Sequence, residues 1–115
     1  MNQIVVDELA LWKSSGFAHE LLDVRRTIAR ERDGTDIADA TWHDPALWLD
    51  WKDKIRREHP VVVYCAHGHE ISQGLSAALC AMGIDARTLV GGIAAWQQAG
   101  LPVRPHAGGT AEPAP

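Results

Sequence analysis

The chain has 115 residues, of which 46% are hydrophobic and 23% are charged. This length and composition suit one domain with one packed core, and they exclude both a two-domain protein and a disordered chain. The formal net charge is −4, with acidic and basic residues interspersed, so the chain lacks the basic stripe of nucleic-acid-binding surfaces. We therefore expect no nucleic-acid partner.

The N-terminal stretch MNQIVVDELALWK has no basic leader followed by a long apolar run. No stretch approaches the ~18 consecutive apolar residues that span a bilayer. We expect a cytoplasmic protein with no membrane partner. Its two cysteines, Cys65 and Cys80, are then expected to be reduced thiols rather than a disulfide.

In the first third of the chain, short apolar runs alternate with helical spacing, a pattern typical of βαβ units. Asp7 is positioned to cap a helix that continues to Ser15, and Gly16 is positioned to end it. A strand is expected at residues 20–24. The charge-dense residues 25–39 have no clear period, and we expect them to form a solvated loop.

An Asp-Pro pair at 44–45 predicts the start of a helix that ends at Pro60. Its apolar face would comprise Leu47, Trp48, Trp51 and Ile55. The run VVVY at 61–64 predicts a strand buried on both faces of a parallel sheet. We expect this strand to be the central one.

The next helix is expected to end at Gly83, with an apolar face of Leu75, Ala78, Leu79 and Met82. A strand at 87–90 and a helix at 93–99 follow. Residues 104–115 contain few large apolar groups that could offset the entropy of ordering, so we expect a flexible C-terminal tail. Cys80, on an alanine-rich helical face, is expected to pack in the core.

Cys65 lies where the predicted central strand ends and a short loop leads into a helix. In open α/β sheets, ligands bind beyond the carboxyl ends of the strands. A short loop at 66–72 tends to aim its N–H groups inward, and the helix dipole adds about half a positive charge. Both effects favour a thiolate, and Gly68 suits the positive φ of a tight loop. We expect a reactive Cys65; a buried inert thiol is the alternative.

Cys65, His67 and His69 could be taken for metal ligands. One short loop supplies neither four ligands nor the paired motif of a structural zinc site. We therefore expect no metal.

Three stretches together resemble the rhodanese-like sulfurtransferases in their single-domain form. These are the cysteine loop VVVYCAHGHEISQG, the Asp-Val-Arg of LLDVRR at 23–25, and the Gly-Gly-x-x-x-Trp of LVGGIAAWQQAGLPV at 91–96. The resemblance covers residues 21–103. It implies an α/β fold with a central parallel sheet of about five strands and helices on both faces. It also implies a rhodanese-like domain at 1–103, followed by the tail at 104–115.

The resemblance further implies sulfur transfer without a cofactor. The Cys65 thiolate would take sulfur from a small anionic donor such as thiosulfate, hold it as a persulfide, and pass it to a thiol or cyanide by double displacement. The substrate-binding loop would comprise Ala66, His67, Gly68, His69, Glu70, Ile71 and Ser72. Asp23 and Arg25, which by themselves could form an ordinary surface ion pair, would lie beside this loop and hold it in shape.

Several positions depart from the family pattern. Many family loops have arginine or serine after the glycine, where this chain has His69, and the Gly-His-Ile-Pro-Gly-Ala stretch is replaced by GTDIADATW. Glu70 would repel a dianionic donor if it pointed inward, whereas His67 and His69 would attract one when protonated. The roles of these three side chains stay open at this point.

Other functions fit parts of the same pattern. Phosphatases and arsenate reductases of the superfamily have an arginine six positions after the cysteine, where this chain has Ile71, so they lack support here. A sulfur carrier with little thiosulfate activity is a closer alternative. A non-catalytic rhodanese-like binding module is another, although such modules usually lack the cysteine.

Overall fold

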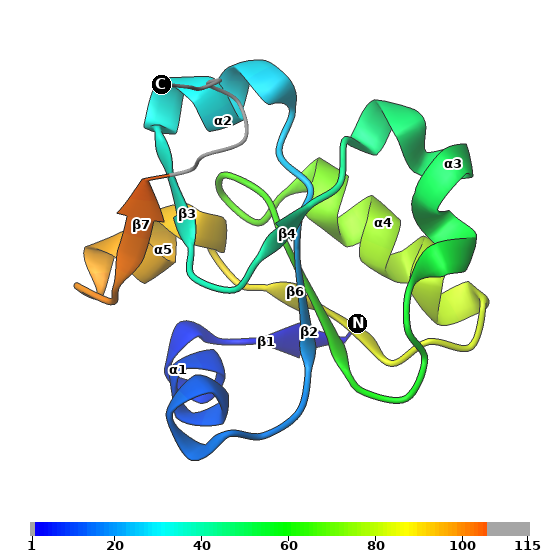
Figure 1. Ribbon diagram of the computed structural model, residues 1–115, viewed down its shortest axis with the longest axis horizontal. Helices are drawn as coiled ribbons and strands as arrows, with labels where there is room; N and C mark the ends of the chain where they lie inside the picture. Colours follow the sequence, from blue (N-terminus) through cyan, green and yellow to red (C-terminus); the bar gives the residue numbers. More distant parts are fainter. Residues whose placement is uncertain (1, 106–115) are drawn as a thin grey trace, which may run out of the picture.

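The computed structural model describes residues 2–105 and contains a central sheet of five parallel strands in the order β1-β6-β5-β2-β4 (Figure 1). The strands are β1 (Gln3–Ile4), β2 (Glu20–Asp23), β4 (Thr41–Trp42), β5 (Val61–Tyr64) and β6 (Ala86–Leu89). The predicted α/β fold with about five parallel strands is therefore confirmed. The pattern did not predict β1 and β4, since each has only two residues.

The central strand β5 is buried on both faces, as the run VVVY predicts. Val61, Val63 and Cys65 belong to one core, which α3 (Trp48–Trp51) and α4 (Glu70–Ala81) cover. Val62 and Tyr64 belong to the other core, which α1 (Val6–Ser15) and α5 (Gly92–Gln98) cover. Figure 1 shows these two helix layers on opposite sides of the sheet. Helices on both faces are thus confirmed.

Helix α1 ends at Gly16, as predicted, and this glycine has the left-handed φ of 75°. The predicted cap at Asp7 is wrong. The cap position is Val5, which makes no side-chain hydrogen bond, and Asp7 lies in the first turn of the helix. An acidic residue there still interacts favourably with the helix dipole.

The predicted long helix at 44–60 is instead three short turns that end at Lys54. They are η1 (Pro45–Leu47), α3 and η2 (Lys52–Lys54). Asp44 does cap the first turn, because its carboxylate accepts a hydrogen bond from the N–H of Ala46 at 2.9 Å. Among residues 2–105, no helix has the length and apolar character needed to cross a bilayer.

Residues 25–39 are not the solvated loop that their charge density predicts. They form α2 (Thr27–Asp33) and β3 (Thr35–Ile37), and β3 pairs in antiparallel register with β7 (Val103–Pro105). The predicted tail therefore begins too early at Arg104, since this residue and Pro105 belong to β7. The remainder of the predicted tail, 106–115, lies outside the described residues.

Candidate active site

Cys65 lies at the point where the connections of the sheet diverge. The strands β2 and β5 are parallel neighbours, with Asp23 opposite Tyr64. The chain leaving β5 passes through α4 to β6, whereas the chain leaving β2 passes through α2 and β3 to β4 on the opposite side. Such divergence opens a crevice at the carboxyl ends of the two strands. A pocket of about 550 Å³ lies there, lined by Cys65 and by residues that follow each strand.

The cysteine sulfur is nearly enclosed but surrounded by polar groups. Cys65 is 6% exposed, and its Sγ lies 3.1 Å from the hydroxyl oxygen of Ser72 in the first turn of α4. Burial raises the pKa of the thiol, but hydrogen bonds from the Ser72 hydroxyl and from the backbone N–H groups of Ser72, His69 and Gly68 outweigh it. The net effect is a pKa below the ordinary value, which favours the thiolate.

The loop takes this shape because its carbonyl groups are bound on the outside. The carbonyl oxygens of Cys65 and Ala66 accept hydrogen bonds from the N–H groups of Ile93 and Ala94, both at 3.0 Å. These donors belong to the first turn of α5. With the carbonyls turned toward α5, the following N–H groups are free to face the sulfur.

Two glycines allow the loop and α5 to approach this closely. A Cβ atom on Gly92 would lie 2.4 Å from the carbonyl oxygen of Cys65, and one on Gly68 would lie 2.7 Å from the backbone nitrogen of Gly91. Both residues also have positive φ, at 62° and 75°. Gly68 therefore has the conformation that the sequence predicts, and the Gly-Gly pair at 91–92 packs against the cysteine loop.

The structure gives each predicted loop residue a definite place. The loop residues that line the pocket with Cys65 are Ala66, His67, His69, Glu70 and Ile71. Gly68 and Ser72 are buried behind them. His67, His69 and Glu70 are exposed at the rim, with the two imidazole rings 6.3 Å apart between centroids.

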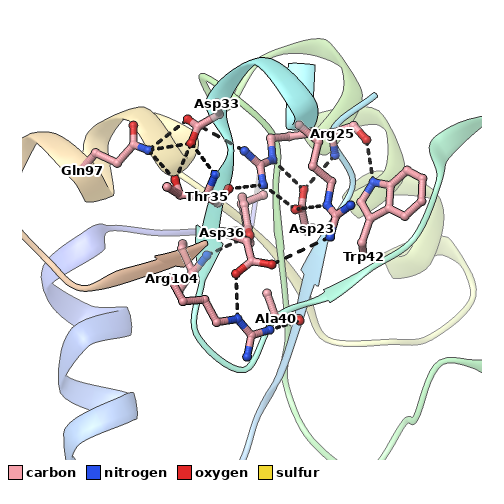
Figure 2. Close-up of polar contacts among 12 residues, drawn as sticks. Asp23, Arg25, Asp33, Thr35, Asp36, Ala40, Trp42, Gln97 and Arg104 are labelled. Carbon is pink, nitrogen blue, oxygen red and sulfur yellow. Dashed lines mark hydrogen bonds and ion pairs between the residues drawn. The ribbon is translucent and has the colours of Figure 1, made fainter. Parts of the chain in front are cut away.

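The Asp23–Arg25 pair is buried rather than an ordinary surface ion pair. Both side chains are 1% exposed, and the Arg25 guanidinium donates to the two Asp23 oxygens at 3.0 and 2.7 Å. Figure 2 shows the guanidinium between Asp23 and the pair Asp33 and Thr35. It donates to the carbonyl oxygen of Thr35 at 2.8 Å and lies 3.9 Å from an Asp33 oxygen. Arg25 lines the Cys65 pocket. Its bonds, however, connect it to Asp33 and Thr35 of the α2–β3 segment and not to the cysteine loop.

Sequence reasoning missed the residues that close the pocket on its second side. Arg26, Ile28 and Ala29 line it from the start of α2. The available signal was their position directly after the Asp-Val-Arg motif, since residues that follow the end of a parallel strand lie at the ligand-binding edge. Among the described residues 2–105, no three His, Cys, Asp or Glu side chains form a group that could hold a metal ion.

Comparisons with known proteins agree with this architecture. The model of the Rhodanese-like domain family matches residues 5–99. The thiosulfate sulfurtransferase GlpE of Actinobacillus succinogenes is 35% identical over 85 residues, which cover 72% of this chain and 73% of that protein.

Solved structures give the same result for the fold. A rhodanese-related protein from Thermoplasma volcanium superposes with a TM-score of 0.80 at 24% identity, covering 92% of this chain and all of that one. A rhodanese-like domain protein from Staphylococcus aureus superposes with a TM-score of 0.73 at 27% identity, covering 84% of this chain and 91% of that one. The chain therefore belongs to the rhodanese-like domain family.

Proposed function

We propose that the protein is a sulfurtransferase that moves sulfane sulfur from a small anionic donor such as thiosulfate to a thiol or cyanide acceptor. The Cys65 thiolate attacks the outer sulfur of the donor. The sulfur–sulfur bond of thiosulfate breaks, sulfite leaves with the electron pair, and Cys65 becomes a persulfide. The acceptor then attacks the outer sulfur of the persulfide and leaves with it, which regenerates the thiolate.

The observation that carries this proposal is the polar environment of the buried Cys65 sulfur. The Ser72 hydroxyl and the N–H groups of Gly68, His69 and Ser72 lower the pKa of the thiol. The same donors suit a persulfide anion, since fixed dipoles in a site shielded from water stabilise charge without reorganisation. The similarity to a thiosulfate sulfurtransferase supports the same chemistry. The proposed reaction needs no metal and no organic cofactor.

In this proposal the substrate-binding loop is 66–72, and Asp23 and Arg25 support it from the neighbouring strand. Their support is indirect. Arg25 fixes the α2–β3 segment through Thr35 and Asp33, and the start of α2 forms the second wall of the pocket.

Mass spectrometry of the intact protein after incubation with thiosulfate tests the proposal. We expect the mass of one added sulfur, its loss on addition of cyanide, and formation of thiocyanate. Cys65→Ser should abolish all three signals. Cys80→Ser is the matched control and should retain them, because Cys80 lies in the last turn of α4, away from the Cys65 pocket lining. There it packs against the core, as predicted, and its thiol contacts the carbonyl oxygen of Ala86 at 3.2 Å.

The same experiment separates the alternative functions. A persulfide that cyanide removes only slowly would indicate a sulfur carrier. A protein that gains no sulfur from thiosulfate and forms no thiocyanate would indicate a binding module, and the proposed activity would then be wrong.

A further inference from the structure

Arg26 lies at the rim of the Cys65 pocket, one residue after the buried Arg25. Its side chain is exposed and lines both the Cys65 pocket and an adjoining pocket of about 500 Å³. Ile28, which is 59% exposed, also lines both pockets. Arg26 is therefore positioned to meet a molecule that enters toward Cys65.

The other charged residues of this pocket do not supply a free permanent cation. The Arg25 guanidinium is bonded to Asp23, a carboxylate that Arg30 shares, and it lies 3.9 Å from Asp33, so its charge is offset by acidic neighbours. Glu70 is negative, and the imidazoles of His67 and His69 carry charge only when protonated.

Arg26 differs from Arg25 in this respect. Its side chain forms no hydrogen bond or ion pair with any other residue in the described range 2–105. Arg26 thus carries a permanent positive charge in the pocket lining and has no acidic partner within the part of the chain that the structure describes.

The first half of the proposed reaction needs such a charge. A thiolate and a dianionic donor bring three negative charges together, and Glu70 adds a fourth at the rim. Backbone N–H groups offset this repulsion only in part, since they carry partial charges. A guanidinium carries a full charge at all relevant pH values, and its planar donors match the oxygen atoms of a sulfonate group.

We propose that Arg26 binds the oxyanion end of the sulfur donor and makes Cys65 selective for negatively charged donors. The inference rests on the proposed sulfurtransferase function. Arg26 exchanges no proton in the reaction. It pairs with the sulfonate oxygens while the sulfur–sulfur bond breaks, and it remains paired with the sulfite until sulfite departs.

Three reagents of different charge test this role. Thiosulfate is a dianion, iodoacetate is a monoanion and iodoacetamide is neutral, and we expect each of them to react with the Cys65 thiolate. The rate of each is measured by mass spectrometry in a Cys80→Ser background, at low ionic strength and about pH 8, where ordinary imidazoles are neutral. Arg26→Gln is compared with Arg32→Gln, which removes the same charge from an exposed position in the last turn of α2, away from the pocket lining.

For Arg26→Gln we expect the second-order rate to fall about tenfold with thiosulfate and about threefold with iodoacetate, with no change for iodoacetamide. Arg32→Gln should stay within about twofold of the parent with all three reagents. Arg26→Lys should recover most of the loss, because it restores the positive charge. Added salt should shrink the difference between parent and Arg26→Gln.

An equal loss with all three reagents would overturn the inference, because it would mean that Arg26→Gln damages Cys65 itself. Equal rates for Arg26→Gln and Arg32→Gln would overturn it as well. Failure of the sulfurtransferase function looks different. In that case the rate of the iodoacetate reaction would still depend on Arg26, but thiosulfate would leave no sulfur on Cys65 in the parent protein.

Discussion

The two walls of the Cys65 pocket are held in place by different kinds of interaction. The cysteine loop, residues 65–72, is held largely through its backbone. Carbonyls of Cys65 and Ala66 bind the first turn of α5, and the carbonyl of Gly68 accepts a hydrogen bond from the Gln73 side chain at 2.8 Å. The α2–β3 segment, residues 27–37, is held largely by charged side chains (Figure 2). The two walls should therefore fail for different reasons.

The charges that hold the α2–β3 segment form one network, which is buried except at Arg104, whose side chain is 49% exposed. Asp23 binds Arg25 at 2.7 Å and lies 3.4 Å from Arg30, which lies 3.9 Å from Asp36. Asp36 in turn accepts a hydrogen bond from Arg104 of β7 at 2.8 Å. Removal of one member leaves its partners charged and without water, which costs more than the intact pair contributes. The backbone-held loop has no such dependence on charge.

Asp23→Asn should have the largest effect on stability. The substitution keeps the shape of the side chain but leaves Arg25 and Arg30 without their shared carboxylate, so we expect the free energy of unfolding to fall by about 3–5 kcal/mol. Urea denaturation followed by tryptophan fluorescence measures the change.

Asp53→Asn is the matched control, because Asp53 is 70% exposed and pairs with Lys52 at 3.0 Å on the surface. Its cost should be less than about 1 kcal/mol. Equal losses for the two variants would mean that the buried network does not hold the α2–β3 wall.

Gly92→Ala should break the other wall through steric overlap. Its new methyl group would lie 2.4 and 2.7 Å from the carbonyl oxygens of Cys65 and Ala66, and its φ of 62° adds backbone strain. We expect a loss of about 2–4 kcal/mol in the free energy of unfolding, together with slower persulfide formation.

Gly100→Ala separates the two causes. Gly100 has a φ of 74°, but no atom lies within 4 Å of an added Cβ. This variant should lose only about 1–2 kcal/mol and keep the rate of persulfide formation. A Gly92→Ala protein as active as Gly100→Ala would show that α5 does not shape the cysteine loop.

The same contrast explains which parts of the molecule the sequence predicts. The VVVY strand, the strand-end position of Cys65 and the positive φ of Gly68 follow from neighbouring residues, and the structure has all three. The α2–β3 segment depends on distant residues. The buried Asp36 accepts a hydrogen bond from Arg104, and these residues are 68 positions apart in the chain. Without knowledge of that pairing, the charged residues at 25–39 predict a solvated loop.

The pocket wall at α2 also shows why the sequence does not predict Arg26 as a pocket residue. Adjacent arginines at 25 and 26 look equivalent in the sequence, but Arg25 is 1% exposed and bonded to Asp23, while Arg26 is exposed. Both line the Cys65 pocket, but the Arg25 side chain is buried in the fold and that of Arg26 is exposed at the rim. The Asp-Val-Arg motif indicates the edge of the sheet but does not distinguish the buried arginine from the exposed one.

Ser72→Ala should have the smallest effect on stability and a specific effect on Cys65. The Ser72 hydroxyl is the strongest of the groups that lower the pKa of Cys65, so its removal should raise that pKa. The rate of Cys65 alkylation by iodoacetamide, measured against pH in a Cys80→Ser background, should show a higher midpoint. Ser76→Ala is the control, since Ser76 is also buried in α4 but lies one turn beyond Ser72. Its midpoint should match the parent protein.

The lowered pKa of Cys65 in the parent protein also makes its stability depend on pH. Because the pKa of Cys65 is lower in the folded protein than in the unfolded chain, ionisation of the thiol favours folding. The stabilisation is fully present above the unfolded pKa of about 8.5 and is lost as the pH falls through the folded pKa. Ser72→Ala should narrow this window, so that its free energy of unfolding rises less with pH than that of the parent. If the free energy of unfolding rises equally with pH in both proteins, the Ser72 hydroxyl does not set the charge of the sulfur, and the backbone N–H groups alone must do so.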